Sequence, residues 1–355
     1  MPVALDQPVD VRAGEEIPIA LVEAHLRRYL PDFSGPFVVE QFAQGHSNLT
    51  YLLRAGETEL ILRRGPFGNQ VKTAHDMGRE HRVLSKLCDV YPPAPRPVLF
   101  CDDPSVMDAP FYVMERRRGV ILRQQLPPGL VIDAPTANRL SIALIDNLAD
   151  LHSLDYQSAG LGDLGKPEGY AARQVSGWTD RYAKAKTDDL PAMDRISDWL
   201  ATQIPRESAP ALIHNDFKYD NLVLDPADLT RVVAVLDWEM ATVGDPLMDL
   251  GTTLGYWVEP NDPPSLRRSA TGPTAVPGSL TRQELVDRYS EKTGREVANV
   301  LFYYAFGLFK IAVIVQQIYA RHVRGLTSDP RFAHLNGLVS VLAEQADRAI
   351  DLGKV

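Results

Sequence analysis

The stretch Leu212–Leu224, LIHNDFKYDNLVL, places a histidine, an aspartate and an asparagine between two apolar ends. The spacing from His214 through Asp216 to Asn221 is H-x-D-x-x-x-x-N. Sixteen residues after Asn221, a run of five apolar residues ends in Asp237. Transfer of a phosphoryl group requires a carboxylate near the attacking hydroxyl, oxygen ligands for Mg²⁺ and cations on the phosphates. The stretch and Asp237 supply the carboxylate and the ligands, so the sequence predicts phosphoryl transfer.

The size and composition of the chain fit two folded domains. It has 355 residues, of which 45% are hydrophobic, so it can bury substantial cores. Its net charge of −9, from 37 basic and 46 acidic residues, argues against nucleic acid or an anionic membrane as the main partner. Cys88 and Cys101 are too far apart for a C-x-x-C motif, so we expect reduced thiols and no disulfide framework.

Two segments bear on the expected compartment. The first 16 residues carry acidic side chains and lack an apolar core, so no signal peptide is expected. The apolar run Val300–Ala320 contains Lys310, which favours a buried helix over a membrane span. We therefore expect a cytoplasmic protein, and the sequence does not indicate its oligomeric state.

Hydrophobic periodicity divides the chain into a strand-rich and a helical part. After a helix predicted at Ile17–Tyr29, the segment Phe37–Arg64 alternates as strands do. Ala74–Leu87 has an apolar stripe close to the helical period, and Phe111–Met114 is predicted to be the last strand of this part. From about Gly119 the pattern becomes mainly helical.

The expected fold is α+β with two lobes, like that of a protein kinase. Residues 1–115 are expected to form a small antiparallel β lobe with one inserted helix, which binds the nucleotide. Residues 116–355 are expected to form a larger, mainly helical lobe with the catalytic segment and the substrate site. These positions resemble the aminoglycoside phosphotransferase-like kinase family, which shares the two-lobed architecture. The resemblance covers most of the chain, from about Val39 onward.

The resemblance implies roles for the polar residues of the central stretch. Asp216 matches the aspartate that accepts or orients the substrate hydroxyl proton. Asn221 and Asp237 match the ligands of the Mg²⁺ ions that bridge the phosphates of ATP, or of GTP. Lys218 is expected to reach the transferred phosphate, with a solvent-facing lysine as the alternative.

Three further residues are expected to support the catalytic segment. We expect His214 to fix the geometry of the segment through hydrogen bonds. Asp245 and Asp249 lie in a Gly-Asp-Pro stretch that the family shares. Helix capping or a buried hydrogen bond is the expected role of both aspartates.

The small lobe contains the expected nucleotide-binding residues. The resemblance puts Gly45, Ser47 and Asn48 at the position of the hairpin that covers the phosphates, and we expect the backbone N–H groups of the last two to meet phosphate oxygens. With one glycine, this segment is otherwise an ordinary β-turn.

Arg63 stands at the strand position that carries a phosphate-binding lysine in protein kinases. A guanidinium can hold phosphates with two hydrogen bonds. Glu80 is expected to pair with Arg63, with a solvent-facing glutamate as the alternative. The hinge that meets the adenine edge through its backbone is expected at the end of the last small-lobe strand, at Met114, Glu115 and Arg116.

A second resemblance bears on the substrate. Pro167–Tyr170, Arg173–Val175, Trp178 and Leu308–Ile311 look similar to the kinase-like domain fused to certain large mammalian acyl-CoA dehydrogenases. That group is implicated in phosphorylating hydroxylated acyl-CoA compounds. Substrate identity therefore rests on analogy.

The charge of two segments agrees with an anionic substrate. Gly169–Lys186 and Leu308–Arg324 carry seven basic residues, against Asp180 as the acid. If these side chains face the active site, they attract an anion and repel a polycationic aminoglycoside; side chains that face solvent are the alternative. We therefore expect an ATP- or GTP-dependent phosphotransferase that acts on a hydroxyl of a small molecule such as a hydroxyacyl-CoA. The alternatives are an aminoglycoside kinase and a nucleotide-binding pseudokinase or scaffold.

Overall fold

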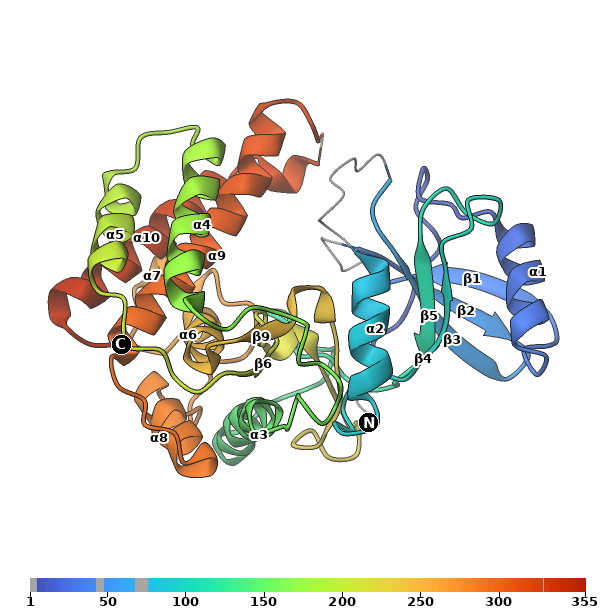
Figure 1. Ribbon diagram of the computed structural model, residues 1–355, viewed down its shortest axis with the longest axis horizontal. Coiled ribbons are helices and arrows are strands. Elements are labelled where there is room, and N and C mark those ends of the chain that lie inside the picture. The colour runs from blue at the N-terminus through green and yellow to red at the C-terminus, as the bar shows by residue number, and fades with distance from the viewer. Residues whose placement is uncertain (1–4, 43–47, 68–75, 328) are drawn as a thin grey trace. The chain divides into compact units, whose positions relative to one another are not determined.

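The computed structural model describes residues 5–42, 48–67, 76–327 and 329–355 (Figure 1). The chain forms two compact units. The smaller unit comprises residues 1–121 and 222–241, and the larger unit comprises residues 122–221 and 242–355. The smaller unit thus includes residues 222–241, which the sequence analysis placed in the helical lobe.

The smaller unit is built on one antiparallel sheet, as predicted. Its strand order is β1-β2-β3-β5-β4. The strands are β1 Phe37–Gln41, β2 Leu49–Ala55, β3 Thr58–Arg64, β4 Pro97–Cys101 and β5 Phe111–Glu115. Two helices accompany the sheet, α1 Ile19–Tyr29 and α2 Met77–Leu87. With the helical larger unit, this confirms the α+β fold of protein kinases.

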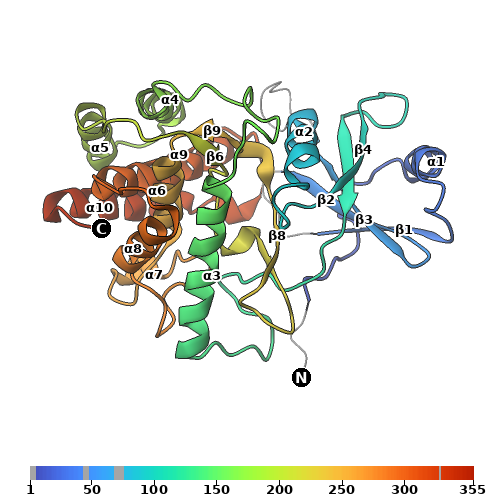
Figure 2. The ribbon, with the colours of Figure 1, turned by 60° about the horizontal axis from the view of Figure 1, so that its bottom comes forward.

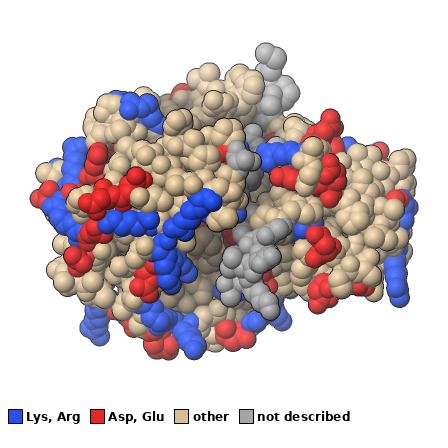
Figure 3. Space-filling view, turned by 90° about the horizontal axis from the view of Figure 1, so that it is seen from above, with Lys and Arg blue, Asp and Glu red and all other residues tan. Residues whose placement is uncertain are grey.

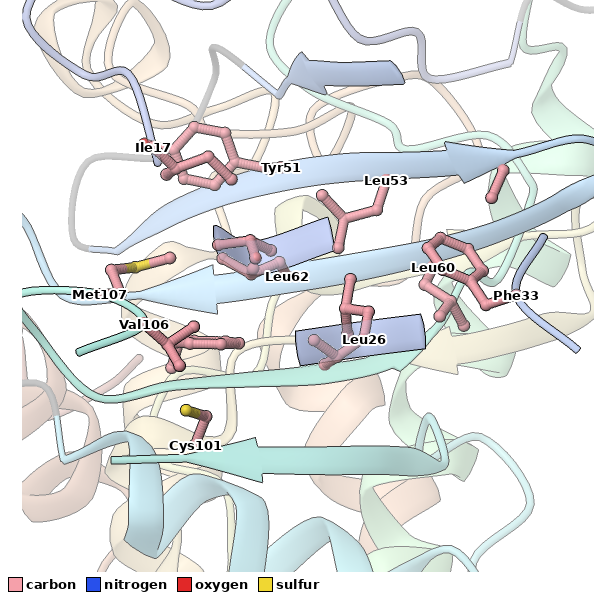
Figure 4. Close-up of a cluster of buried hydrophobic side chains, with 14 residues drawn as sticks. Ile17, Leu26, Phe33, Tyr51, Leu53, Leu60, Leu62, Cys101, Val106 and Met107 are labelled. Carbon is pink, nitrogen blue, oxygen red and sulfur yellow. The ribbon is translucent and has the colours of Figure 1, made fainter. Parts of the chain in front are cut away.

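Side chains along β3 alternate between the two faces of the sheet, and this alternation decides which face Arg63 lies on. Leu60 and Leu62 belong to a buried cluster that includes Leu26 of α1 (Figure 4). Because successive side chains of a strand point to opposite faces, Ile61 and Arg63 face the other side of the sheet. Helix α2 packs against β4 and β5, and its Glu80 contacts Arg63 on that side.

A short hairpin completes the smaller unit. Strands β7 (Leu222–Leu224) and β8 (Val232–Val235) pair antiparallel, and the 3₁₀ turn η2 (Trp238–Met240) follows. Asp237 precedes this turn and has a φ of 68°. This left-handed conformation is uncommon outside glycine, although aspartate and asparagine adopt it more readily than most residues.

The larger unit is mainly helical (Figure 2). Its helices are α3 Ala134–His152, α4 Tyr170–Ala185, α5 Pro191–Thr202, α6 Pro246–Tyr256, α7 Pro264–Arg267, α8 Arg282–Thr293, α9 Val300–Val323 and α10 Leu335–Leu352, with the 3₁₀ turns η1 Tyr219–Asn221 and η3 Pro330–Phe332. Strands β6 (Ala211–Ile213) and β9 (Thr242–Gly244) pair antiparallel. The short helix α7 lies within residues 259–278, whose richness in Pro, Gly, Ser and Thr predicts an exposed loop.

Helix α9 forms the centre of the larger unit. It packs against α4, α5, α6 and α10. By length and composition it could cross a membrane, but most of its apolar stretch is buried inside the unit, as expected for a core helix. Helices α6 and α9 are in close backbone contact at Gly251 and Gly307. A Cβ on Gly307 would lie 2.1 Å from the carbonyl oxygen of Gly251, so a larger residue would not fit there. This close packing brings both helices to the catalytic segment.

Candidate active site

The catalytic segment, residues 214–221, follows β6 in the larger unit. His214 and Asn215 are buried, and Asn215 has a φ of 70°. The N–H of Asp216 donates to Nδ1 of His214 at 3.2 Å. His214 thus hydrogen-bonds within the segment, which is the contact expected of a supporting residue.

The carboxylate of Asp216 is surrounded by donors from its own unit. Nζ of Lys218 lies 3.0 Å from both carboxylate oxygens. The hydroxyl of Tyr256, at the end of α6, donates to Oδ1 at 2.7 Å, and Nδ2 of Asn221 donates to Oδ2 at 2.9 Å. Burial alone would raise the pKa of Asp216, but the charge of Lys218 and the hydrogen bond from Tyr256 outweigh it and hold the pKa below its ordinary value. Asp216 is therefore an ionised, oriented carboxylate.

Lys218 is not a solvent-facing lysine. Its side chain is 19% exposed, and its ammonium lies 4.4 Å from the centre of the Tyr256 ring. Burial would lower the pKa of Lys218, but the charge of Asp216 raises it above the ordinary value. The lysine is thus charged and lies beside the predicted base.

Asn221 directs its amide nitrogen toward Asp216, with donations to both the backbone oxygen (2.8 Å) and Oδ2 (2.9 Å). Its amide oxygen is the atom suited to a metal ion. Amide and carboxylate oxygens are ligands that Mg²⁺ accepts, so the amide of Asn221 and the carboxylate of Asp237 are each chemically suited to this ion. Within the described residues, no group of three or more His, Cys, Asp or Glu side chains is arranged to hold a metal.

Asp249 supports the catalytic segment from α6. Its carboxylate accepts from the backbone N–H of His214 at 2.6 Å and of Asn215 at 2.8 Å. His152 lies 3.1 Å from the same carboxylate. Burial would raise the pKa of Asp249, but the contact with His152 helps to hold it below the ordinary value. Asp249 thus fixes the backbone just before Asp216.

Asp245 caps the start of α6. It accepts from the N–H of Leu247 at 2.9 Å and from the hydroxyl of Ser208 at 2.6 Å. The hydroxyl of Tyr303 on α9 lies 3.2 Å from its other oxygen. The contacts are those of a capping, buried aspartate, as the sequence analysis expected.

In the smaller unit, Arg63 joins two carboxylates. It lies 2.5 Å from Glu80 and 2.8 Å from Asp237. Glu80 also accepts from the N–H of Trp238 at 3.1 Å. Burial raises the pKa of Glu80 to about 7, although the charge of Arg63 opposes the shift. Glu80 is therefore not solvent-facing, and it holds both Arg63 and the turn that follows Asp237.

The other predicted nucleotide contacts are partly described. Gly45 and Ser47 lie outside the described residues. The side chain of Asn48 donates to Glu239, two residues after Asp237, at 2.9 Å.

The expected hinge residues lie at the end of β5. Met114 is buried, and the N–H of Glu115 donates to the carbonyl of Arg96 at 2.9 Å. The side chain of Arg116, the first residue after the strand, pairs with Glu59 at 2.6 Å. A contact between this backbone and adenine stays a prediction.

Comparison with known proteins identifies the family. Residues 38–282 match the APH phosphotransferase enzyme family. The chain belongs to this family.

Three similar proteins illustrate the relationship. Acyl-CoA dehydrogenase family member 11 from Rattus norvegicus is 35% identical over 345 residues, which is 95% of this chain and 44% of the relative. Family member 10 from Mus musculus is 35% identical over 339 residues, 95% of this chain and 31% of the relative. A solved structure assigned as an aminoglycoside phosphotransferase, from Ralstonia eutropha, is 34% identical with a TM-score of 0.78, and the match covers 95% of this chain and 99% of that one. The chain thus spans less than half the length of the two acyl-CoA dehydrogenase relatives, and both predicted resemblances are confirmed.

Two side chains at this candidate site were not predicted. Tyr256 contacts Asp216 directly, and His152 contacts Asp249 and the hydroxyl of Tyr289. Tyr256 lies seven residues after Asp249 on the same helix, which is two turns along the same face. That spacing could have revealed Tyr256, whereas the contact of His152, 97 residues before Asp249, leaves no local signal.

Proposed function

We propose that this chain transfers the γ-phosphate of ATP or GTP to a hydroxyl of a small molecule. The observation that carries the proposal is the carboxylate of Asp216, which a lysine, a tyrosine and an asparagine contact directly. Phosphoryl transfer depends mainly on positioning and charge. Family membership supports the reaction class.

Lys218 and Asp216 act together in the proposed reaction. A carboxylate has about four acceptor positions, and the donors around Asp216 occupy positions on both oxygens. The acceptor hydroxyl replaces Lys218 on Asp216, and the freed ammonium turns to the γ-phosphate. The acceptor oxygen then bonds to the γ-phosphorus while the bond to the β–γ bridging oxygen breaks, the nucleoside diphosphate leaves, and the hydroxyl proton passes to Asp216.

The smaller unit contributes the phosphate and metal groups. Arg63 is a fixed cation for the phosphates, since Glu80 orients its guanidinium. Asp237 and Asn221 are the proposed ligands of Mg²⁺, which neutralises charge on the phosphate oxygens when bound.

The acceptor is proposed to be anionic, although fewer basic residues support this than the sequence suggested. Of the seven, five make contacts within the protein: Arg173 with the carbonyls of Lys166 and Glu168, Arg181 with the ring of Trp178 at 4.4 Å, Lys186 with Asp189 and Asp194, Lys310 with Asn215, and Arg324 with the carbonyl of Lys184. Arg181, Lys184 and Arg321 are exposed. Figure 3 shows basic and acidic side chains interspersed over the larger unit. The proposed recognition of an anion therefore rests on individual exposed residues, with Arg181, Lys184 and Arg321 as the candidates.

The relatives suggest the class of acceptor. Two of them are named as acyl-CoA dehydrogenase family members, which directs the proposal to hydroxyacyl-CoA compounds. An assay of nucleoside diphosphate release, with Mg-ATP or Mg-GTP and a set of hydroxyl compounds, tests it. We expect turnover with a hydroxyacyl-CoA and little with kanamycin-type aminoglycosides. Nucleotide binding without turnover of any compound would identify a pseudokinase instead, and efficient phosphorylation of aminoglycosides would overturn the acceptor class alone.

A further inference from the structure

Lys310 is a buried cation at the centre of α9. Its side chain is 2% exposed, and it is one of the few charged side chains in the core of the larger unit. Its hydrogen-bond acceptors are the backbone oxygen of Asn215 (2.7 Å), Oδ1 of Asn215 (3.2 Å) and the hydroxyl of Thr252 (3.5 Å). All three are neutral groups. Burial of an ammonium against neutral acceptors is costly, so a core role alone does not explain why α9 carries a lysine here.

The main acceptor of Lys310 is the residue just before Asp216. Asn215 has a φ of 70°, a left-handed conformation that costs free energy for a residue with a Cβ. Its N–H donates to Asp249 at 2.8 Å, and its side-chain nitrogen donates to the hydroxyl of Tyr170 at 3.2 Å. Lys310 donates to the backbone oxygen and to Oδ1 of Asn215, and Oδ1 also lies 3.5 Å from the hydroxyl of Tyr170. Helices α4, α6 and α9 therefore fix one strained peptide from three directions.

We propose that Lys310 is a positioning residue that holds Asn215 in its left-handed conformation and thereby aims the carboxylate of Asp216 at the acceptor hydroxyl. The proposal rests on the proposed phosphotransferase function. A rotation of the Asn215 peptide changes the direction in which the chain enters Asp216. Because transfer requires near-linear alignment of the reacting atoms, a small rotation at this point lowers the rate more than it lowers substrate binding.

The electrostatic surroundings agree with this role. Burial lowers the pKa of Lys310 to about 8, with Asp249 on α6 and Asp216 opposing the shift, and Lys218 and Arg181 on α4 adding to it. The ammonium is thus charged at neutral pH. It lies 5.9 Å from the ring centre of Trp178, which adds a favourable cation–π contact.

Lys310→Met tests the proposal, because methionine keeps the length of the side chain and removes its donors. We expect kcat to fall by about 10- to 100-fold, while the KM for the nucleotide stays within about twofold of the wild-type value. Gln316→Met is the matched control. Gln316 is buried on the same helix, but it contacts Ala185 and Thr187 rather than the catalytic segment. This variant is expected to lose similar hydrogen bonds and to keep its kcat.

A double variant shows whether Lys310 acts through Asn215. Glycine adopts positive φ without strain, so Lys310→Met is expected to lower kcat less in an Asn215→Gly background than in the wild type. Equal losses in both backgrounds, or an equal loss in Gln316→Met, would overturn the positioning role.

Amide hydrogen exchange separates this inference from the proposed function, because it needs no turnover. Lys310→Met is expected to speed exchange at His214–Asp216, and Gln316→Met is not. If the wild-type protein turns over no acceptor but the exchange differs as expected, the proposed function is wrong, whereas the role of Lys310 in holding Asn215 is supported. Unchanged exchange in Lys310→Met would show that Lys310 does not hold Asn215 in place, whether or not the protein is a kinase.

Discussion

The two units hold their candidate reactive carboxylates in opposite ways. In the smaller unit one guanidinium, that of Arg63, is shared between the carboxylates of Glu80 and Asp237. In the larger unit one carboxylate, that of Asp216, is shared among three donors. The first cluster has more anions than cations, and the second is saturated with donors.

This difference in charge suits the two clusters to two different tasks. Burial in the smaller unit raises the pKa of Glu80 to about 7, whereas the donors in the larger unit hold the pKa of Asp216 below its ordinary value. A cluster with surplus negative charge is suited to attract a metal cation with its nucleotide. A carboxylate surrounded by donors is suited to stay ionised and to orient a neutral hydroxyl.

Removal of one carboxylate at a time tests this division with the largest expected effect. Asp216→Asn is expected to lower kcat by roughly 10²- to 10⁴-fold, the range for loss of a general base, with the Kd for the nucleotide unchanged. Asp237→Asn is expected to weaken the binding of Mg-nucleotide. Steady-state kinetics and calorimetric titration measure the two effects. If both variants lost nucleotide affinity equally, the division of tasks between the units would be wrong.

Arg63 tests the smaller-unit cluster through stability. Arg63→Met leaves Glu80 buried without its ion partner, which is expected to cost about 3–5 kcal/mol. The double variant Arg63→Met/Glu80→Met replaces the pair by apolar side chains and is expected to recover most of the melting temperature but not the nucleotide affinity. Recovery of both would show that Arg63 serves the fold and not the phosphates.

Lys310 provides a pH test in the larger unit. Its pKa falls from 10.5 to about 8 on folding, so between these values the unfolded chain binds more protons and stability rises with pH. From pH 8 to 10.5 the wild type is expected to gain up to about 3 kcal/mol relative to Lys310→Met. Urea unfolding of both proteins across this window measures the difference, and parallel curves would show that Lys310 titrates normally.

Tyr256 is expected to give the smallest effect. Tyr256→Phe removes one hydrogen bond to the ionised Asp216, and such bonds contribute about 1.5–3 kcal/mol. We expect kcat to fall by roughly tenfold or more, with nucleotide affinity unchanged. Tyr304→Phe, which removes the hydroxyl that accepts a hydrogen bond from Gln345 on α10, is the control. A similar loss of kcat in both variants would assign Tyr256 to general stability.

Local patterns in the sequence predicted the strands and helix α2 of the smaller unit, and the position of the catalytic segment. The alternation of Phe37–Arg64 gave the strands, and the stripe that ends at Leu87 gave α2, where Glu80 occupies a buried position among apolar neighbours. The H-x-D-x-x-x-x-N spacing located the segment in which Asp216 and Asn221 are in contact. These features depend on neighbours in the chain, which a sequence displays directly.

Contacts between residues far apart in the chain could not be predicted from the sequence. Lys310 binds Asn215 across 95 residues and His152 binds Asp249 across 97, and no local period reports such pairs. The sequence placed Lys310 in an expected buried helix and also among the basic residues that would face an anionic substrate or solvent. The structure buries it against the catalytic segment instead. No helix was predicted beyond the segment of α9, although α10 (Leu335–Leu352) packs against that helix.

The central claim is that the chain is a phosphotransferase that uses Asp216 to orient its acceptor. Phosphorus NMR of wild-type protein with Mg-ATP and a hydroxyacyl-CoA tests it most directly, with Asp216→Asn as the control. The account predicts a new phosphomonoester signal that grows in step with ADP for the wild type and is nearly absent for the variant. Equal signals from both proteins would contradict the role of Asp216, and ADP without a phosphorylated product would contradict transfer to the acceptor.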